Sequence, residues 1–191
     1  KTALGAGETA DAVAYLFTTA LTGGQSGVFS FRVNVAASAQ VQTISNTAVM
    51  KFNDSLAATS QSSNTTTTSV NFVAAVVIRD TDATIDDIQP VTSGSAGSTM
   101  VFTNQVQNTA NGADRFNITV ANVSFPTGTT FTLFAADGTS PLLDTNADGI
   151  PDTGLMNAAA TLNIIMKATL PANATNAGAP FNATVTAKSV T

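Results

Sequence analysis

The 191-residue chain contains no cysteine, no histidine and no tryptophan, and its only glutamate is Glu8. Without cysteine, it can form neither a disulfide nor a thiolate metal site. Without histidine, it has no side chain whose ordinary pKa lies near neutrality, so histidine-based catalytic triads and histidine–metal sites are excluded. The only groups left for acid–base chemistry are carboxylates.

Charge is scarce as well. Charged residues make up 10% of the chain, well below the usual quarter, and the formal net charge is −5. Seven dispersed lysines and arginines cannot neutralise a nucleic-acid backbone or bind an anionic membrane surface. No apolar run reaches the length of a membrane span. The abundance of threonine, alanine, asparagine, serine and valine instead favours an extracellular or cell-surface β protein. Because the chain begins at Lys1 without a signal segment, we expect a processed product or a piece of a longer protein.

Alternation of apolar and polar residues is the dominant pattern. Residues 27–35 read GVFSFRVNV, with phenylalanine and valine on one face and serine, arginine and asparagine on the other. Such period-two alternation predicts a half-buried strand. Similar patterns or β-favouring composition predict further strands at 44–52, 68–79, 99–108, 114–120, 129–136, 160–170 and 180–188. With glycine-containing turns between them, these segments predict an all-β fold of antiparallel sandwiches.

Two blocks are expected, an N-terminal β module at 1–76 and a β-sandwich at 77–191. The first block has few strands for a closed sandwich, so it is either incomplete or completed by another chain. Its Ser/Thr/Asn-rich stretch, which includes residues 64–69, is interpreted as a loop. Residues 7–21 fit a helix or a strand, and the strand is favoured. Since residues 11–21 are apolar on both faces, residues 1–21 are a candidate donor strand for a neighbouring sheet, the alternative being a central strand of their own domain.

A cluster of acid stands out at residues 144–152, which read DTNADGIPD. The spacing matches a calcium loop: side chains at alternating positions, a glycine for the turn, and then a backbone carbonyl. The predicted Ca²⁺ ligands are Asp144, Asn146, Asp148, Ile150 (through its carbonyl) and Asp152. Leu155 stands where a bidentate glutamate would be expected, and Asp137 or water could replace it. The alternative is a metal-free loop of aspartate and asparagine turns.

A second acidic cluster, RDTDATIDD, spans residues 79–87 and includes Asp80, Asp82, Asp86 and Asp87. It lacks a glycine at the turn position, so it is a weaker candidate for calcium. The alternative interpretation is a solvated acidic linker between the two blocks.

The stretches Asp144 to Gly154, Leu170-Pro171 and Phe181 to Val190 resemble a repeated immunoglobulin-like β-sandwich module of large prokaryotic cell-surface proteins. The acidic loop itself resembles the calcium loops of thrombospondin type 3 repeats and dockerin modules. The resemblance implies an immunoglobulin-like fold, a location on the cell surface, and tandem or polymeric assembly. It implies no catalytic activity.

We therefore expect a structural protein and not an enzyme, because the loop carboxylates lie too close together in sequence to flank a substrate. The leading hypothesis is a subunit of an extracellular, pilus-like filament or surface layer. Copies of the chain would form a homopolymer by strand addition, stiffened by calcium. The alternative is an adhesin stalk or a surface module that binds glycans.

Overall fold

The computed structural model describes residues 15–16, 19, 21–36, 39–54, 57–82, 87–91, 93–121, 123–175 and 180–191. Contacts divide the chain into two units, residues 1–37 and 38–191, and each is considered by itself. The described residues form β-strands and no helix, so none of them provides a helix that could cross a membrane.

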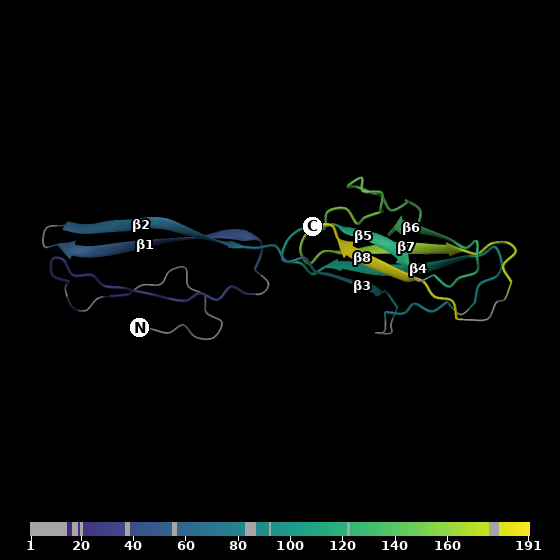
Figure 1. The fold of residues 1–191 in the computed structure, drawn as a ribbon, viewed down its shortest axis with the longest axis horizontal. Coiled ribbons are helices and arrows are strands. Elements are labelled where there is room, and N and C mark those ends of the chain that lie inside the picture. Colours follow the sequence, from purple (N-terminus) through teal and green to yellow (C-terminus); the bar gives the residue numbers. More distant parts are fainter. Residues whose placement is uncertain are drawn as a thin grey trace. The chain divides into compact units, whose positions relative to one another are not determined.

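Four strands form the larger antiparallel sheet, in the order β3-β4-β7-β6 (Figure 1). They are β3 (Val76–Asp80), β4 (Thr99–Asn108), β7 (Thr161–Thr169) and β6 (Thr130–Ala135). The smaller sheet pairs β5 (Phe116–Ala121) with β8 (Thr184–Ser189). The strands β4 to β8 match the predictions at 99–108, 114–120, 129–136, 160–170 and 180–188.

One apolar core joins the two sheets. Phe116 and Ile118 of β5 pack with Val106 of β4 and Ile164 of β7, and all four are fully buried. Alternate residues of β4, β5 and β7 point into this core, as the period of a half-buried strand requires. The predicted all-β, antiparallel sandwich is therefore confirmed.

A long hairpin precedes the sandwich in the chain, formed by β1 (Gln42–Asp54) and β2 (Ala57–Val70). The interpretation of the Ser/Thr/Asn-rich stretch as a loop was therefore wrong. Threonine is β-branched and suits a pleated strand, and facing hydroxyls bond across the pair: Thr47 Oγ1 and Thr65 Oγ1 lie 2.7 Å apart. The strand predicted at 68–79 is in fact divided, because residues 71–75 separate β2 from β3.

The strand predicted at 27–35 is absent from the structure. Residues 25–36 belong to no strand, and their apolar side chains are exposed, with Val28 at 90% and Val33 at 69%. Phe29 and Phe31 nevertheless stack with ring centroids 5.8 Å apart, which places them on the same side of the backbone, as alternation predicted. The pattern of a strand is present, but no strand is described within residues 1–37 to pair with it. Most of the candidate donor strand at 1–21 lies outside the described residues.

Asn111 ties the base of the hairpin to the sandwich. Its side-chain amide donates to the carbonyls of Ala39 (3.1 Å) and Asn71 (2.9 Å), one on each side of the hairpin. Its side-chain oxygen accepts from Val73 N (2.8 Å), and its backbone carbonyl accepts from Val41 N (3.2 Å). These bonds fasten the hairpin to the sandwich within the unit of residues 38–191.

Replacing Asn111 with alanine is expected to lower the free energy of unfolding by about 1–2 kcal/mol, because three side-chain hydrogen bonds are lost at a single residue. The exposed Asn157 serves as a matched control. Amide hydrogen exchange checks the prediction: the Val73 amide should exchange roughly tenfold faster in the Asn111 variant, since about 1.4 kcal/mol corresponds to a factor of ten. An unchanged exchange rate of the Val73 amide would show that the hydrogen bonds of Asn111 do not hold the base of the hairpin.

Candidate functional site

The acidic loop connects β6 to β7 and also bridges the two sheets. Backbone hydrogen bonds fasten its start to β6 and its end to β5. They are Ala135 N to Ser140 O (2.8 Å), Leu142 N to Leu133 O (3.0 Å), Ile118 N to Pro151 O (2.8 Å) and Thr153 N to Phe116 O (3.1 Å). The loop is therefore a structural link across the sandwich.

Asp152 is the internal anchor of this loop. The residue is only 2% exposed. Its carboxylate accepts from Thr145 N and Oγ1 (both 2.6 Å), Gly154 N (2.6 Å) and Asn146 N (3.3 Å). Arg115 Nε lies 3.5 Å from the same carboxylate. Burial raises the pKa of Asp152, but the hydrogen bonds from Thr145 and Gly154 outweigh it and leave the pKa below its ordinary value.

The exposed half of the loop turns tightly around its own acidic side chains. Asp144 accepts from the backbone amides of Asp148 (3.2 Å) and Gly149 (2.8 Å), while Asp148 accepts from Ile150 N (2.9 Å). Positive φ angles of 61° at Ala147 and 87° at Gly149 make the turn possible. Hydrogen bonds from backbone amides to the Asp144 and Asp148 carboxylates thus hold this part of the chain in one compact turn.

Asp148 has a second set of partners. Its Oδ2 accepts from Asn117 Nδ2 (2.6 Å) on β5 and from Asn146 Nδ2 (3.0 Å) within the loop. These hydrogen bonds, that of Asn117 above all, lower the pKa of Asp148, so the group is ionised at neutral pH. An exposed negative charge is therefore fixed beside the sandwich.

Calcium requires six to eight oxygen ligands, and the loop supplies only part of such a set. Asp144, Asn146, Asp148 and the Ile150 carbonyl lie together in the exposed turn. Asp152 has a different role, since its oxygens already accept four hydrogen bonds. In the part of the chain that the structure describes, no three histidine, cysteine, aspartate or glutamate residues gather closely enough to hold a metal. The four groups of the turn fit a calcium ion only if water completes its shell.

Sequence reasoning missed the contribution of β5, and of Arg115 just before it, to this site. Arg115 and Asn117 flank the buried Phe116 and meet Asp152 and Asp148 respectively. In the alternating segment 114–120, the sequence indicated that the apolar residues form the buried face, and Arg115 and Asn117 lie on the opposite, polar face. Only the pairing of β5 with residues 151–153 shows that this polar face contacts the acidic loop.

The second acidic cluster is described only in part. Asp80 lies at the end of β3, and Asp87 has a positive φ of 56°. Asp86 lies outside the described residues. The structure therefore adds no argument for calcium at residues 79–87.

Asp137 closes a turn of its own, before the acidic loop. It accepts from Ser140 Oγ (2.6 Å), Ser140 N (2.8 Å) and Thr139 N (2.8 Å). These bonds, led by that of the Ser140 hydroxyl, lower the pKa of Asp137 from 3.8 to about 2.

Stability is expected to fall with acidification below about pH 4. The pKa values of Asp137, Asp148 and Asp152 are all lower in the folded state, so folding favours their ionised forms. Their stabilisation is complete above the ordinary pKa near 3.8 and is lost as the pH falls through the folded value, which for Asp137 is about 2. Urea midpoints at pH 5, 3 and 2 measure the loss, and a carboxyl NMR titration of Asp137 should have its midpoint near 2. A midpoint near 3.8 would contradict the turn geometry.

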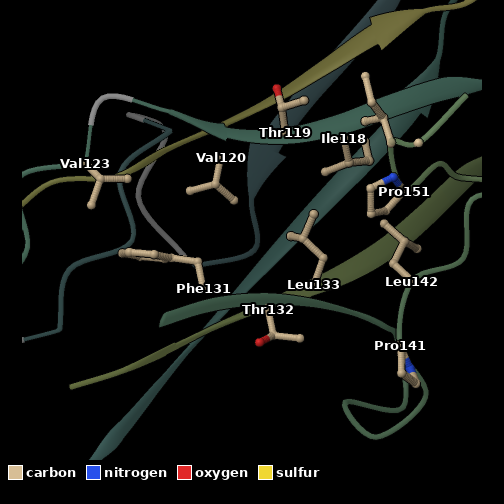
Figure 2. Close-up of a pocket in the computed structure, with 12 residues that line it drawn as sticks. Ile118, Thr119, Val120, Val123, Phe131, Thr132, Leu133, Pro141, Leu142 and Pro151 are labelled. Carbon is tan, nitrogen blue, oxygen red and sulfur yellow. The ribbon is translucent and has the colours of Figure 1, made fainter. Parts of the chain in front are cut away.

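An open groove lies beside the loop, between β5 and β6 (Figure 2). Its volume is about 560 Å³, and most of its lining is apolar. The main apolar lining residues are Ile118, Val120, Val123, Phe131, Leu133 and Leu142. The groove is open to solvent, so its apolar side chains form part of the surface of the sandwich.

No protein-family model, curated protein sequence or solved structure matches this chain. The features of the chain that bear on its function are therefore its groove, its acidic loop and its exposed apolar segments.

Proposed function

We propose that this protein is a structural subunit of an extracellular filament or surface layer, whose copies join by adding a strand of one copy to an open sheet of the next. The observation that carries the proposal is the series of large apolar side chains exposed on a segment with strand periodicity. They are Phe29, Phe31, Val33 and Val35, which share one face of residues 27–35. Single exposed apolar residues are ordinary, but a contiguous set on a monomer is typical of an interaction surface.

The hairpin of β1 and β2 supports the same proposal. Two strands alone are marginally stable in water, and each open edge is a template for another strand. Ile44, Val49 and Met50 of β1 are exposed. Covering these side chains in an assembly would remove them from water and stabilise the hairpin.

The geometry of assembly favours a polymer over a closed dimer. A donor segment and an acceptor groove are different surfaces, so their contact is heterologous. Heterologous contacts form rings when the rotation between copies closes, and filaments when it does not. The resemblance to repeated modules of prokaryotic surface proteins supports the extracellular location.

Sedimentation velocity and negative-stain electron microscopy of the purified full chain test the proposed function. We expect concentration-dependent assembly into filaments or sheets. A monomer at every concentration up to the limit of solubility would refute a self-assembling role.

Calcium binding by the exposed half of the loop is part of the proposal. Asp144, Asn146, Asp148 and the Ile150 carbonyl would hold the ion, neutralising two carboxylates in a loop that links the sheets. Calcium at 100 times its dissociation constant would add about 2.7 kcal/mol to the free energy of unfolding and raise the Tm by several degrees.

Thermal unfolding in calcium and in excess chelator checks the calcium prediction, and Asp144→Asn/Asp148→Asn is the control that should abolish the difference. If the unaltered chain has the same Tm in calcium and in chelator, the loop does not bind calcium and this part of the proposal is wrong.

A second candidate function is that of an adhesin stalk or a glycan-binding module. It is favoured by the exposed hydroxyl-rich strand β2, which carries four consecutive threonines at 65–68. A glycan array tests it, with Thr65→Val/Thr67→Val as the variant expected to lose any signal. Glycan binding without self-assembly would favour this candidate over the filament.

A further inference from the structure

The groove is open at one end because each of its two edge strands is only half covered. On β5, residues 151–153 pair with the first half, and on β6, residues 140–142 pair with the second half. Thr119–Ala121 of β5 and Thr130–Thr132 of β6 remain at the edges. In the described parts of the chain, no strand pairs with either stretch on the groove side. Uncovered backbone thus flanks an apolar floor on both sides.

The uncovered end is also the aromatic end. Phe131 and Val120 lie there with Val123, opposite the end formed by Leu142 and Pro151 (Figure 2). Phe125 meets Phe131 edge to face, with ring centroids 5.3 Å apart. An incoming phenylalanine would extend this cluster in a geometry that aromatic rings prefer.

Residues 28–35 have the complementary features. Phe29, Phe31, Val33 and Val35 occupy one alternating face, on which Phe29 stacks on Phe31 (5.8 Å between ring centroids) and on Tyr15 (5.4 Å). Insertion would replace the contact with Tyr15 by contacts with the groove. The eight residues contain no proline, so every backbone N–H can donate. A strand of this kind needs a partner on each edge and an apolar floor.

We propose that residues 28–35 of one copy add to a second copy at the open end of its groove, where Phe29–Phe31 lie between the uncovered stretches Thr119–Ala121 of β5 and Thr130–Thr132 of β6. This inference rests on the proposed function and names the two surfaces that meet. Phe29 and Phe31 face the groove, and the opposite face, which carries Arg32, faces solvent.

Charge complementarity favours another copy of this chain as the occupant. Arg32 is the one cation of residues 21–36. The groove is bordered by Gly149, Ile150 and Pro151, next to the exposed carboxylates of Asp144 and Asp148. These carboxylates belong to the loop at the covered end of the groove, so they would attract a basic side chain on the outer face of a strand at the open end without contacting it. Association should therefore weaken with added salt.

Complementation between two inactivated chains tests the insertion. The first chain, Phe29→Asn/Phe31→Asn, lacks the apolar face of the segment but keeps the groove. The second, Val120→Asn/Val123→Asn, lacks the groove surface but keeps the segment. The matched controls are Ser30→Asn/Asn34→Ser on the opposite face of the segment and Thr127→Asn outside the groove. Because Val123 is 46% exposed, Val123→Asn alone serves as a groove variant that should still fold.

Each inactivated chain alone should remain monomeric, with assembly requiring at least tenfold higher protein concentration, because burial of an apolar side chain contributes a factor of this order. Mixed together, they should form a one-to-one heterodimer that grows no further, and both controls should assemble like the unaltered chain. If the unaltered chain assembles but the Phe29/Phe31 variant assembles equally well, or the mixture gives no heterodimer, this insertion is wrong while self-assembly stands. If the unaltered chain does not assemble at all, the proposed function itself fails.

Discussion

Replacing Asp152 with asparagine is expected to lower the free energy of unfolding by about 3–5 kcal/mol, the usual cost of removing one partner from a buried charged network. The carboxylate accepts four hydrogen bonds, and its side chain is fully buried. The asparagine side chain has only one oxygen. Its NH₂ group would take the place of the other carboxylate oxygen and would face N–H or O–H donors without being able to accept from them. Arg115, whose side chain is 27% exposed, would also lose the carboxylate beside it.

Urea unfolding at pH 7 measures this effect. The control is Asp144→Asn in the same loop, which changes the same chemical group at an exposed position and should cost less than about 1 kcal/mol. Equal losses for the two variants would contradict the role of Asp152 as the internal anchor.

Asn108→Asp is expected to cost about 3 kcal/mol or more at pH 7, although the two side chains have nearly the same shape. Asn108 is 0% exposed, and its amide donates to the carbonyls of Gly112 (3.0 Å) and Met156 (2.9 Å) while its oxygen accepts from Ala110 N (2.9 Å). A carboxylate would lose both donations and would place a buried charge against two carbonyl oxygens.

The pH dependence of this variant has a definite sign. Burial and the facing carbonyls raise the pKa of the new carboxyl in the folded state, so folding favours its neutral form. The destabilisation should therefore be largest above that raised pKa and smaller below about pH 4. Asn157→Asp, at an exposed position, is the control. A loss that does not change between pH 4 and pH 7 would show that residue 108 is not buried among acceptors.

The sequence predicted the strands of the sandwich well where two signals agreed. Residues 99–108 and 160–170 combine alternation with β-branched residues, and they became β4 and β7. β2 was missed because its composition is ambiguous: serine and asparagine are common in loops, whereas threonine is common in strands. Its pairing with β1 is what makes this segment a strand. For residues 27–35, alternation predicted which side chains share a face, but a strand also needs a partner to pair with, and alternation does not predict one.

The candidate site could be located from the sequence, but the roles of its residues could not be assigned. The spacing of Asp144, Asn146, Asp148 and Gly149 identified a tight acidic loop, because short acceptor side chains and a glycine determine such turns locally. Asp152 looked equivalent to the other acids, yet it is buried. Its burial depends on Arg115 and on the pairing of residues 151–153 with β5, which are contacts between distant parts of the chain.

Contacts between differently labelled copies test the central claim most directly. We would prepare one population of the chain with ¹³C and another with ¹⁵N, assemble them as a mixture, and record only intermolecular correlations by solid-state NMR. Strand insertion between copies predicts cross-peaks that link Phe31 or Val33 of one population to Val120 or Phe131 of the other. If these pairs are correlated only within singly labelled copies, or not at all, the groove is not filled by a second copy and the account is contradicted.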